Sequence, residues 1–128
     1  MADGKNSIAP RGPVGVFRAA KWSMQGLIAA WRVESSFRLE VYMLAVFGPL
    51  GLWFGQGPIE KILLVGSLLL VLAAELLNSA IEAVIERYGP EHHALAGMAK
   101  DMGSAAVAVL MINVLLTWGL IFVPRLLS

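Results

Sequence analysis

The segment 73–86 reads AAELLNSAIEAVIE, and it decides the fold because it continues the apolar run 62–72 without a break. At about 100° per residue, its polar residues fall within roughly 100° of one another on one face of a helix. These residues are Glu75, Asn78, Ser79, Glu82 and Glu86. The sequence therefore predicts a long helix that runs from the membrane interior directly into a polar stripe.

Glu75 is the unusual member of this stripe. The 13 residues from Ile62 to Ala74 precede it without a charge, and an ionisable group in such a setting costs several kcal/mol unless it is paired or hydrated. A rise of about 1.5 Å per residue separates Glu75 from Glu82 by roughly 10 Å, which places one carboxylate at bilayer depth and the other near water. Glu86 fits equally well as a surface charge at a helix end.

The composition is that of a membrane protein. Hydrophobic residues make up 58% of the 128 residues, charged residues 15%, and the mean hydropathy is +0.72, far from the balance of a soluble domain. The absence of cysteine excludes disulfides, thiolate metal sites and cysteine nucleophiles. Six of the ten Lys and Arg residues precede Val41, which predicts a cytoplasmic N-terminus.

The chain divides into a tail, a surface helix and three spans. Residues 1–13 read as a disordered tail, and residues 14–128 as a single membrane domain. An amphipathic pattern over 14–34, with Trp22 and Trp31, predicts a helix lying on the cytoplasmic leaflet. Spans are predicted at about 39–55, 59–88 and 102–123, with Ser35 or Ser36 capping the first, a kink at Pro49, a stop at Gly89-Pro90 and a polar loop through Asp101. We thus expect an all-α membrane protein.

These residues can supply the parts of a phosphoryl-transfer site. Glu34 and Glu82 are hard oxygen ligands suited to Mg²⁺, and Lys100 can hold a phosphate as a point charge. Glu75 can accept a proton from a lipid hydroxyl, and Asn78 can orient that carboxylate. Neither a Walker loop nor a protein-kinase signature is present. Glu34 also fits a plain helix-end charge, and Lys100-Asp101 an interfacial pair at a helix start.

Two long motifs carry a resemblance to a known family. The stretches 75–82 (ELLNSAIE) and 99–106 (AKDMGSAA) closely resemble the signature of the small prokaryotic integral-membrane diacylglycerol kinases. The similarity covers about residues 16–120 and includes 34–40 (ESSFRLE). It implies a homotrimer in the bacterial inner membrane that takes part in phospholipid metabolism. In such a trimer, composite active sites between chains use MgATP to convert diacylglycerol to phosphatidic acid, with no nucleic-acid partner.

The resemblance also assigns roles to single residues. It makes Glu75 the catalytic base and Asn78 its support. The metal and nucleotide would be bound by Glu34 and Glu82, and ATP also by Trp22, Glu91, His92, His93, Lys100 and Asp101. The lipid site would be lined by Ala19, Ala20, Lys21, Trp22, Ser23, Met24, Trp31, Ser36, Phe37, Arg38, Leu39, Glu40 and Ser104.

The chain departs from the family pattern at three positions. Gly15 stands where an arginine is typical, Met98 where a basic residue is, and Ala94 where an acid is. These departures bear on nucleotide contacts and not on the reaction type. Two alternatives stay open. One is an undecaprenol kinase of the same family. The other is a non-enzymatic scaffold or channel subunit, which would conduct ions and lack kinase activity.

Overall fold

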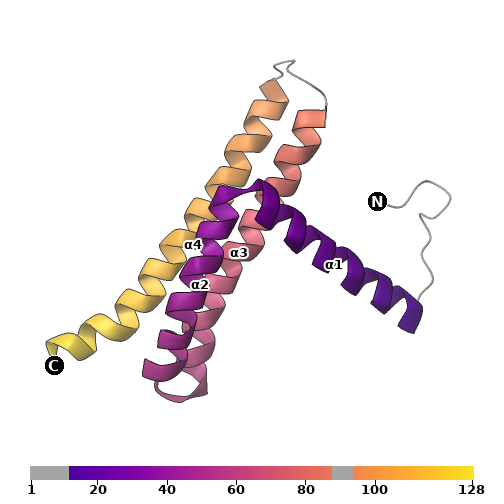
Figure 1. The fold of residues 1–128 in the computed structure, drawn as a ribbon. Coiled ribbons are helices and arrows are strands. Elements are labelled where there is room, and N and C mark those ends of the chain that lie inside the picture. Colours follow the sequence, from indigo (N-terminus) through magenta and orange to yellow (C-terminus); the bar gives the residue numbers. More distant parts are fainter. Residues whose placement is uncertain (1–11, 88–93) are drawn as a thin grey trace.

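The computed structural model describes residues 12–87 and 94–128. Over these residues the chain forms four helices and no strand: α1 (Pro13–Val33), α2 (Ser35–Phe54), α3 (Gly57–Arg87) and α4 (Ala94–Leu127). Helices α2, α3 and α4 run side by side, and α1 leaves this bundle obliquely as an arm (Figure 1). The predicted all-helical class is confirmed.

Three of the helices are long and apolar enough to cross a membrane. They contain 20, 31 and 34 residues, and their most apolar windows have mean hydropathies of 1.3, 2.1 and 2.4. At 1.5 Å per residue, α2 just matches a hydrocarbon core of about 30 Å, whereas α3 and α4 exceed it by roughly 15–20 Å. In Figure 1 both extend past the α1–α2 junction at the same end. The chain is a multi-pass membrane protein.

The junction between α1 and α2 is tighter than the sequence suggests. Glu34 alone separates the two helices, with φ −106° and ψ 110°. The Glu34 N–H donates to Ala30 O at 2.9 Å, and Glu34 O accepts from the Arg38 N–H at 3.2 Å. Helix α2 therefore begins at Ser35, and the predicted serine cap was wrong: Glu34 is the N-cap, and its side chain makes no capping bond.

Helix α4 begins earlier than predicted. Its first residue is Ala94, so Lys100 and Asp101 lie in its second turn and not at the end of a loop. Residues 94–99 are mostly Ala, Leu and Met, which are strong helix formers, and this preference outweighs the polarity that suggested a loop. Helix α3 ends at Arg87, and the predicted stop at Gly89-Pro90 lies outside the described residues.

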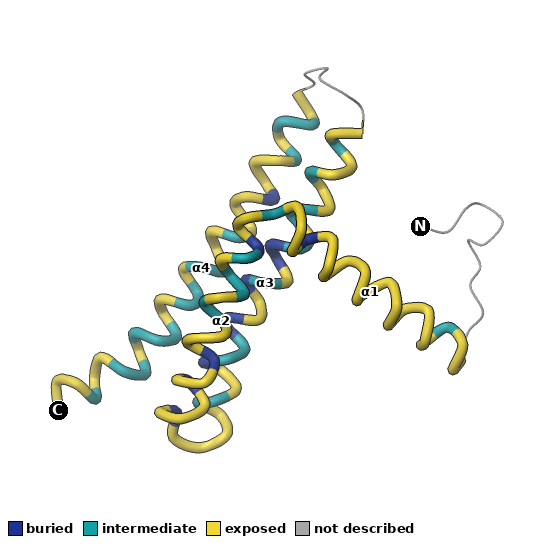
Figure 2. The backbone as a smooth tube through the Cα atoms, in the orientation of Figure 1, coloured by how far each residue is buried: buried dark blue, intermediate teal, exposed yellow. Residues whose placement is uncertain are grey.

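The core of the single chain is a thin layer along α3. Leu64 and Val71 are its fully buried side chains, and Figure 2 shows buried residues gathered along α3 where α2 crosses it. Gly51 of α2 permits this contact, because an added Cβ would lie 3.2 Å from the Leu64 Cβ. Trp118 of α4 donates from Nε1 to Leu64 O at 3.2 Å and to the Ser67 Oγ at 3.3 Å.

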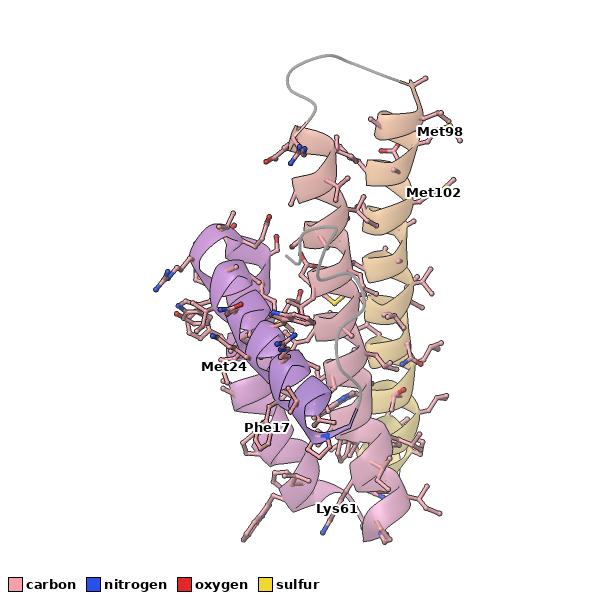
Figure 3. The ribbon with its side chains drawn as sticks, turned by 90° about the vertical axis from the view of Figure 1, so that its right-hand side faces the viewer. Phe17, Met24, Lys61, Met98 and Met102 are labelled. Carbon is pink, nitrogen blue, oxygen red and sulfur yellow. The ribbon has the colours of Figure 1, made fainter. Side chains whose placement is uncertain are left out.

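Much of the apolar surface is left uncovered by the single chain. No residue of the most apolar window of α4 is buried, and Leu115 and Leu120 are each 73% exposed. On α1, Phe17 and Met24 project from the arm (Figure 3). Such surfaces are covered by lipid or by further protein chains. Whether α1 lies on the membrane surface stays a prediction.

Candidate functional site

Glu75 is buried on α3. Its residue is 6% exposed, and the Ser36 hydroxyl from the first turn of α2 hydrogen-bonds its carboxylate. Glu34 and Glu82 lie close enough to Glu75 for their charges to interact with it, and so does Glu40. Carboxylates from the α1–α2 junction, from α2 and from α3 thus surround the Glu75 position on the fold. Glu75 is not a solvated surface charge.

A cavity of about 720 Å³ opens on Glu75, and we call it the central pocket. Helix α2 contributes two serines and Glu40, α3 contributes Glu75, Asn78 and Glu82, and α4 contributes Ser104 beside small apolar residues. The full lining is Ser35, Ser36, Leu39, Glu40, Glu75, Asn78, Glu82, Ser104, Val107 and Ala108. Seven of the predicted site residues therefore line one pocket within a single chain.

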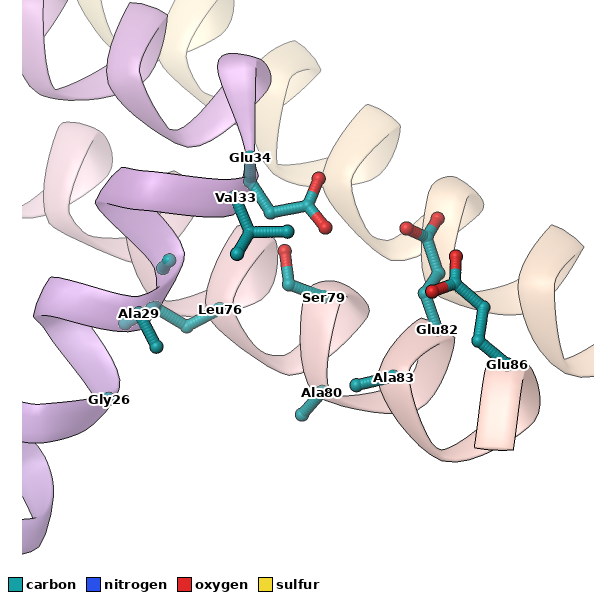
Figure 4. A pocket seen from close by; sticks show the side chains of 11 residues that line it. Gly26, Ala29, Val33, Glu34, Leu76, Ser79, Ala80, Glu82, Ala83 and Glu86 are labelled. Carbon is teal, nitrogen blue, oxygen red and sulfur yellow. The ribbon is translucent and has the colours of Figure 1, made fainter. Parts of the chain in front are cut away.

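A second cavity of about 320 Å³ lies between α1 and α3, and we call it the elbow pocket. Glu34, Ser79, Glu82 and Glu86 point toward the same side of it (Figure 4). Small residues on the two helices, among them Gly26, Ala29, Ala80 and Ala83, form its floor. Glu82 lines both pockets, so it stands at the boundary between them.

Asn78 is held at the central pocket by contact with α4. Its Oδ1 is buried and has no hydrogen-bond partner among the described residues. A Cβ added to Gly103 would collide with this oxygen. Gly103 therefore gives the Asn78 amide the space it occupies, which joins α3 to α4 beside Glu75.

A small apolar cavity of about 110 Å³ adjoins the central pocket at Glu40, which lines both. Its other walls are Met43, Leu68, Val71, Met111, Val114 and Leu115. An apolar cavity thus lies next to the polar pocket, and its walls are side chains of the middle of the bundle. An amphiphilic ligand can place its polar and apolar parts in the two cavities.

The described residues contain no group of three or more His, Cys, Asp or Glu arranged to hold a metal ion. Glu34 and Glu82 do share the elbow pocket. Two carboxylates fit Mg²⁺, which keeps several waters and takes its remaining oxygens from substrate phosphates.

Other predicted site residues do not line these pockets in the single chain. Lys100 and Asp101 are exposed on α4, and Trp22 lies on the exposed arm with the rest of 19–24. Phe37 is in the core, 3% exposed, and Trp31 packs edge-on against Tyr42 at 5.6 Å between ring centroids. Glu91, His92 and His93 lie outside the described residues. The roles given to all of these residues stay predictions.

Two features of the site were not predicted. Gly103 belongs to the motif 99–106, but its contact with Asn78 was not predicted, because the two residues are distant in sequence. The elbow pocket was missed as well, since its floor is made of small residues on two separate helices. The periodic alanines at 80 and 83 were the available signal, but alanine is common in any helix.

Comparison with known proteins places the chain in a family. The sequence profile described as "Prokaryotic diacylglycerol kinase" matches residues 21–122. A diacylglycerol kinase of Escherichia coli (strain K12) is 45% identical over 103 residues, covering 80% of this chain and 84% of that protein. That of Haemophilus influenzae is 44% identical over 104 residues, covering 81% and 88%. That of Pseudomonas aeruginosa is 40% identical over 106 residues, covering 83% and 86%. The chain therefore belongs to the prokaryotic diacylglycerol kinase family.

Proposed function

We propose that this chain is an ATP-dependent diacylglycerol kinase, which transfers the γ-phosphoryl group of ATP to diacylglycerol and forms phosphatidic acid. Its family membership supports this activity. The single structural observation that carries it is the buried carboxylate of Glu75, facing a polar pocket between three candidate membrane spans. A lipid hydroxyl reaches such a carboxylate without leaving the bilayer.

Glu75 acts as the general base. It takes the proton from the lipid hydroxyl as that oxygen forms a bond to the γ-phosphorus, and the bond from the γ-phosphorus to the β,γ-bridging oxygen breaks to release ADP. The Ser36 hydroxyl, which bonds the Glu75 carboxylate, holds it toward the central pocket. Asn78, packed against Gly103, presents its amide to the same space.

Glu34 and Glu82 would hold the Mg²⁺ of MgATP. They reach the elbow pocket from two different elements, Glu34 from the α1–α2 junction and Glu82 from α3. Bound Mg²⁺ neutralises phosphate oxygens in phosphoryl transfer. Because Glu82 also lines the central pocket, it brings the nucleotide side of the site next to Glu75. This arrangement separates the polar donor from the apolar acceptor.

The remaining nucleotide contacts come from neighbouring chains of a trimer. Lys100, Asp101 and Trp22 are exposed and line neither pocket in one chain, which supports a site completed by another copy. The uncovered apolar surface of α4 supports association of copies. The N-terminus and the α3–α4 end face the cytoplasm, where ATP is present, and the membrane is the bacterial inner membrane.

The test uses purified protein in detergent micelles with radiolabelled ATP, offered diacylglycerol and undecaprenol in parallel. We expect labelled phosphatidic acid and no comparable labelling of undecaprenol. Preferential labelling of undecaprenol would reassign the acceptor within the family. Ion flux in vesicles without any lipid phosphorylation would reject the kinase.

A further inference from the structure

The bend between α1 and α2 consists of one extended residue, and that residue is Glu34. A helix that ends leaves its last carbonyls without intrahelical donors. At the end of α1 these carbonyls include Trp31 O and Arg32 O. Their partner comes from the next helix.

Arg38, in the first turns of α2, reaches back to the end of α1. Its Nη1 donates to Trp31 O at 2.7 Å and lies 3.4 Å from Arg32 O. A guanidinium at this place satisfies open carbonyls and opposes the negative end of the α1 dipole. Hydrogen bonds from a charged donor are stronger than neutral ones. The contact therefore joins the two helices across the bend.

Trp31 is held from α2 a second time. Its ring meets the ring of Tyr42 edge to face, with centroids 5.6 Å apart and planes at 80°, a favoured aromatic geometry. Tyr42 follows Arg38 by four residues, so both side chains leave the same face of α2. The last turn of α1 thus contacts α2 both through its backbone carbonyls and through the Trp31 ring.

The angle between α1 and α2 determines where the Glu34 side chain lies. The backbone of Glu34 is bonded to α1 through its N–H and to α2 through its carbonyl oxygen, so it cannot turn independently of the two helices. Its carboxylate lines the elbow pocket, and Glu82 lines the same pocket from α3. A change of the angle would therefore move the Glu34 carboxylate relative to that of Glu82.

We propose that Arg38 is a positioning residue for Glu34: by holding the last carbonyls of α1, it keeps the Glu34 carboxylate opposite Glu82. This inference rests on the proposed role of Glu34 in binding MgATP. It differs from the lipid contact that the family resemblance implies for Arg38. Its effect on the reaction therefore belongs to the nucleotide side of the site.

The kinetic test compares Arg38→Ala with Arg38→Lys and with Arg32→Ala. Arg32 is an exposed neighbour of the bend with the same charge, so Arg32→Ala controls for charge alone. For Arg38→Ala we expect the KM for MgATP to rise about tenfold, while the KM for diacylglycerol changes less than about twofold. Arg38→Lys keeps a charged donor and should recover part of the loss. In a Glu34→Gln background, Arg38→Ala should add little.

A distance measurement tests the bend without any turnover. The chain has no cysteine, so spin labels can be attached to cysteines introduced at Phe17 on α1 and Ile62 on α3, both exposed. Labelled chains are diluted with unlabelled ones so that distances within one chain are measured. We expect the distribution to broaden in Arg38→Ala and to stay narrow in Arg32→Ala. This result would hold even if Glu34→Gln showed that Glu34 has no part in MgATP binding.

Tyr42 supplies a second pair of variants if Arg38→Ala does not fold. Tyr42→Ala removes the ring that contacts Trp31 and should change the distance and the KM for MgATP in the same direction. Tyr42→Phe keeps the ring and should match the wild type. The proposal is overturned if Arg38→Ala, or Tyr42→Ala where Arg38→Ala does not fold, leaves both readouts unchanged. A raised KM for diacylglycerol with an unchanged distance would also overturn it, since Arg38 would then contact the lipid.

Discussion

The Glu75 carboxylate combines burial with access to a pocket. Apolar Val71 and Ala74 precede it on α3 and are buried with it, whereas Ser36 and Asn78 stand on its open side. A carboxylate in such a place is costly for a membrane helix. In the proposed reaction, its neighbours hold it where a lipid hydroxyl approaches from the bilayer.

Replacement of Glu75 by Gln removes the proton acceptor and keeps the side-chain shape. We expect kcat to fall by about a hundredfold or more, the range assigned to general bases, with helix content by circular dichroism unchanged. MgATP binding, measured by equilibrium dialysis, should be largely retained. Turnover near that of the wild type would reject Glu75 as the base.

Gly103 is the position beside the site at which an added side chain would collide with a pocket residue. In Gly103→Ala the new methyl group would collide with the Asn78 Oδ1, so the amide must shift from its place beside Glu75. We expect kcat to fall about tenfold, the cost of a displaced catalytic group. Gly119→Ala is the matched control on α4, because an added Cβ there meets nothing within 4 Å. Equal activity of the two variants would contradict the steric argument.

At the scale of elements, α4 is tied to the rest of the bundle at separated points. Near the site, Gly103 packs on Asn78. In the middle, Trp118 donates a hydrogen bond to Leu64 O of α3. Its ring also packs against Phe47 of α2, with ring centroids 5.7 Å apart. At the far end, Arg125 pairs with Glu60 and lies over the Phe122 ring. These contacts set the register of α4, and thereby the position of Gly103 against Asn78.

The Arg125 contact can be tested by exchange. Arg125→Ala loses the ion pair with Glu60 and the contact with Phe54 O, and the thermal unfolding midpoint in detergent should fall by a few degrees. A chain carrying both Glu60→Arg and Arg125→Glu should recover part of the difference, because the pair is rebuilt in reverse. Lys61→Ala, which removes the charge next to Glu60 and leaves the Arg125–Glu60 pair intact, serves as a control. No recovery in the exchanged chain would indicate that Arg125 acts through Phe122 and Phe54 instead.

At the scale of the whole molecule, one chain holds only part of the proposed site. Glu34, Glu75 and Glu82 lie on two joined pockets of the same chain, whereas Lys100 is exposed on α4. A symmetric trimer repeats each contact between neighbours. If the nucleotide contacts cross between chains, residues of the two groups belong to different copies at each site.

Mixed oligomers test whether the two groups of residues at one site come from the same chain or from different chains. Equal amounts of Glu75→Gln and Lys100→Ala chains, each inactive alone, should recover about a quarter of wild-type activity when unfolded and reassembled together, because one site in four receives both intact residues. The control mixes Glu75→Gln with Glu82→Gln. These two residues line one pocket of one chain, so no recovery is expected. Recovery in the control but not in the first mixture would reverse the assignment of residues to chains.

The sequence by itself determined the helical membrane class, the three spans and the polar stripe on α3. These depend on local hydropathy and on a period of 3.6 residues, which a helix expresses wherever it is placed. The starts of α2 and α4 were predicted too late in the chain, at about 39 and 102, whereas the helices begin at Ser35 and Ala94. At both places the preference of the local residues for helix competes with their polarity. Only the tertiary structure decided that Ser36 bonds Glu75, that Gly103 packs on Asn78 and that Glu34 faces Glu82. Each of these contacts joins residues distant in sequence, and their distance is set by how two helices pack and bend, which no local pattern encodes.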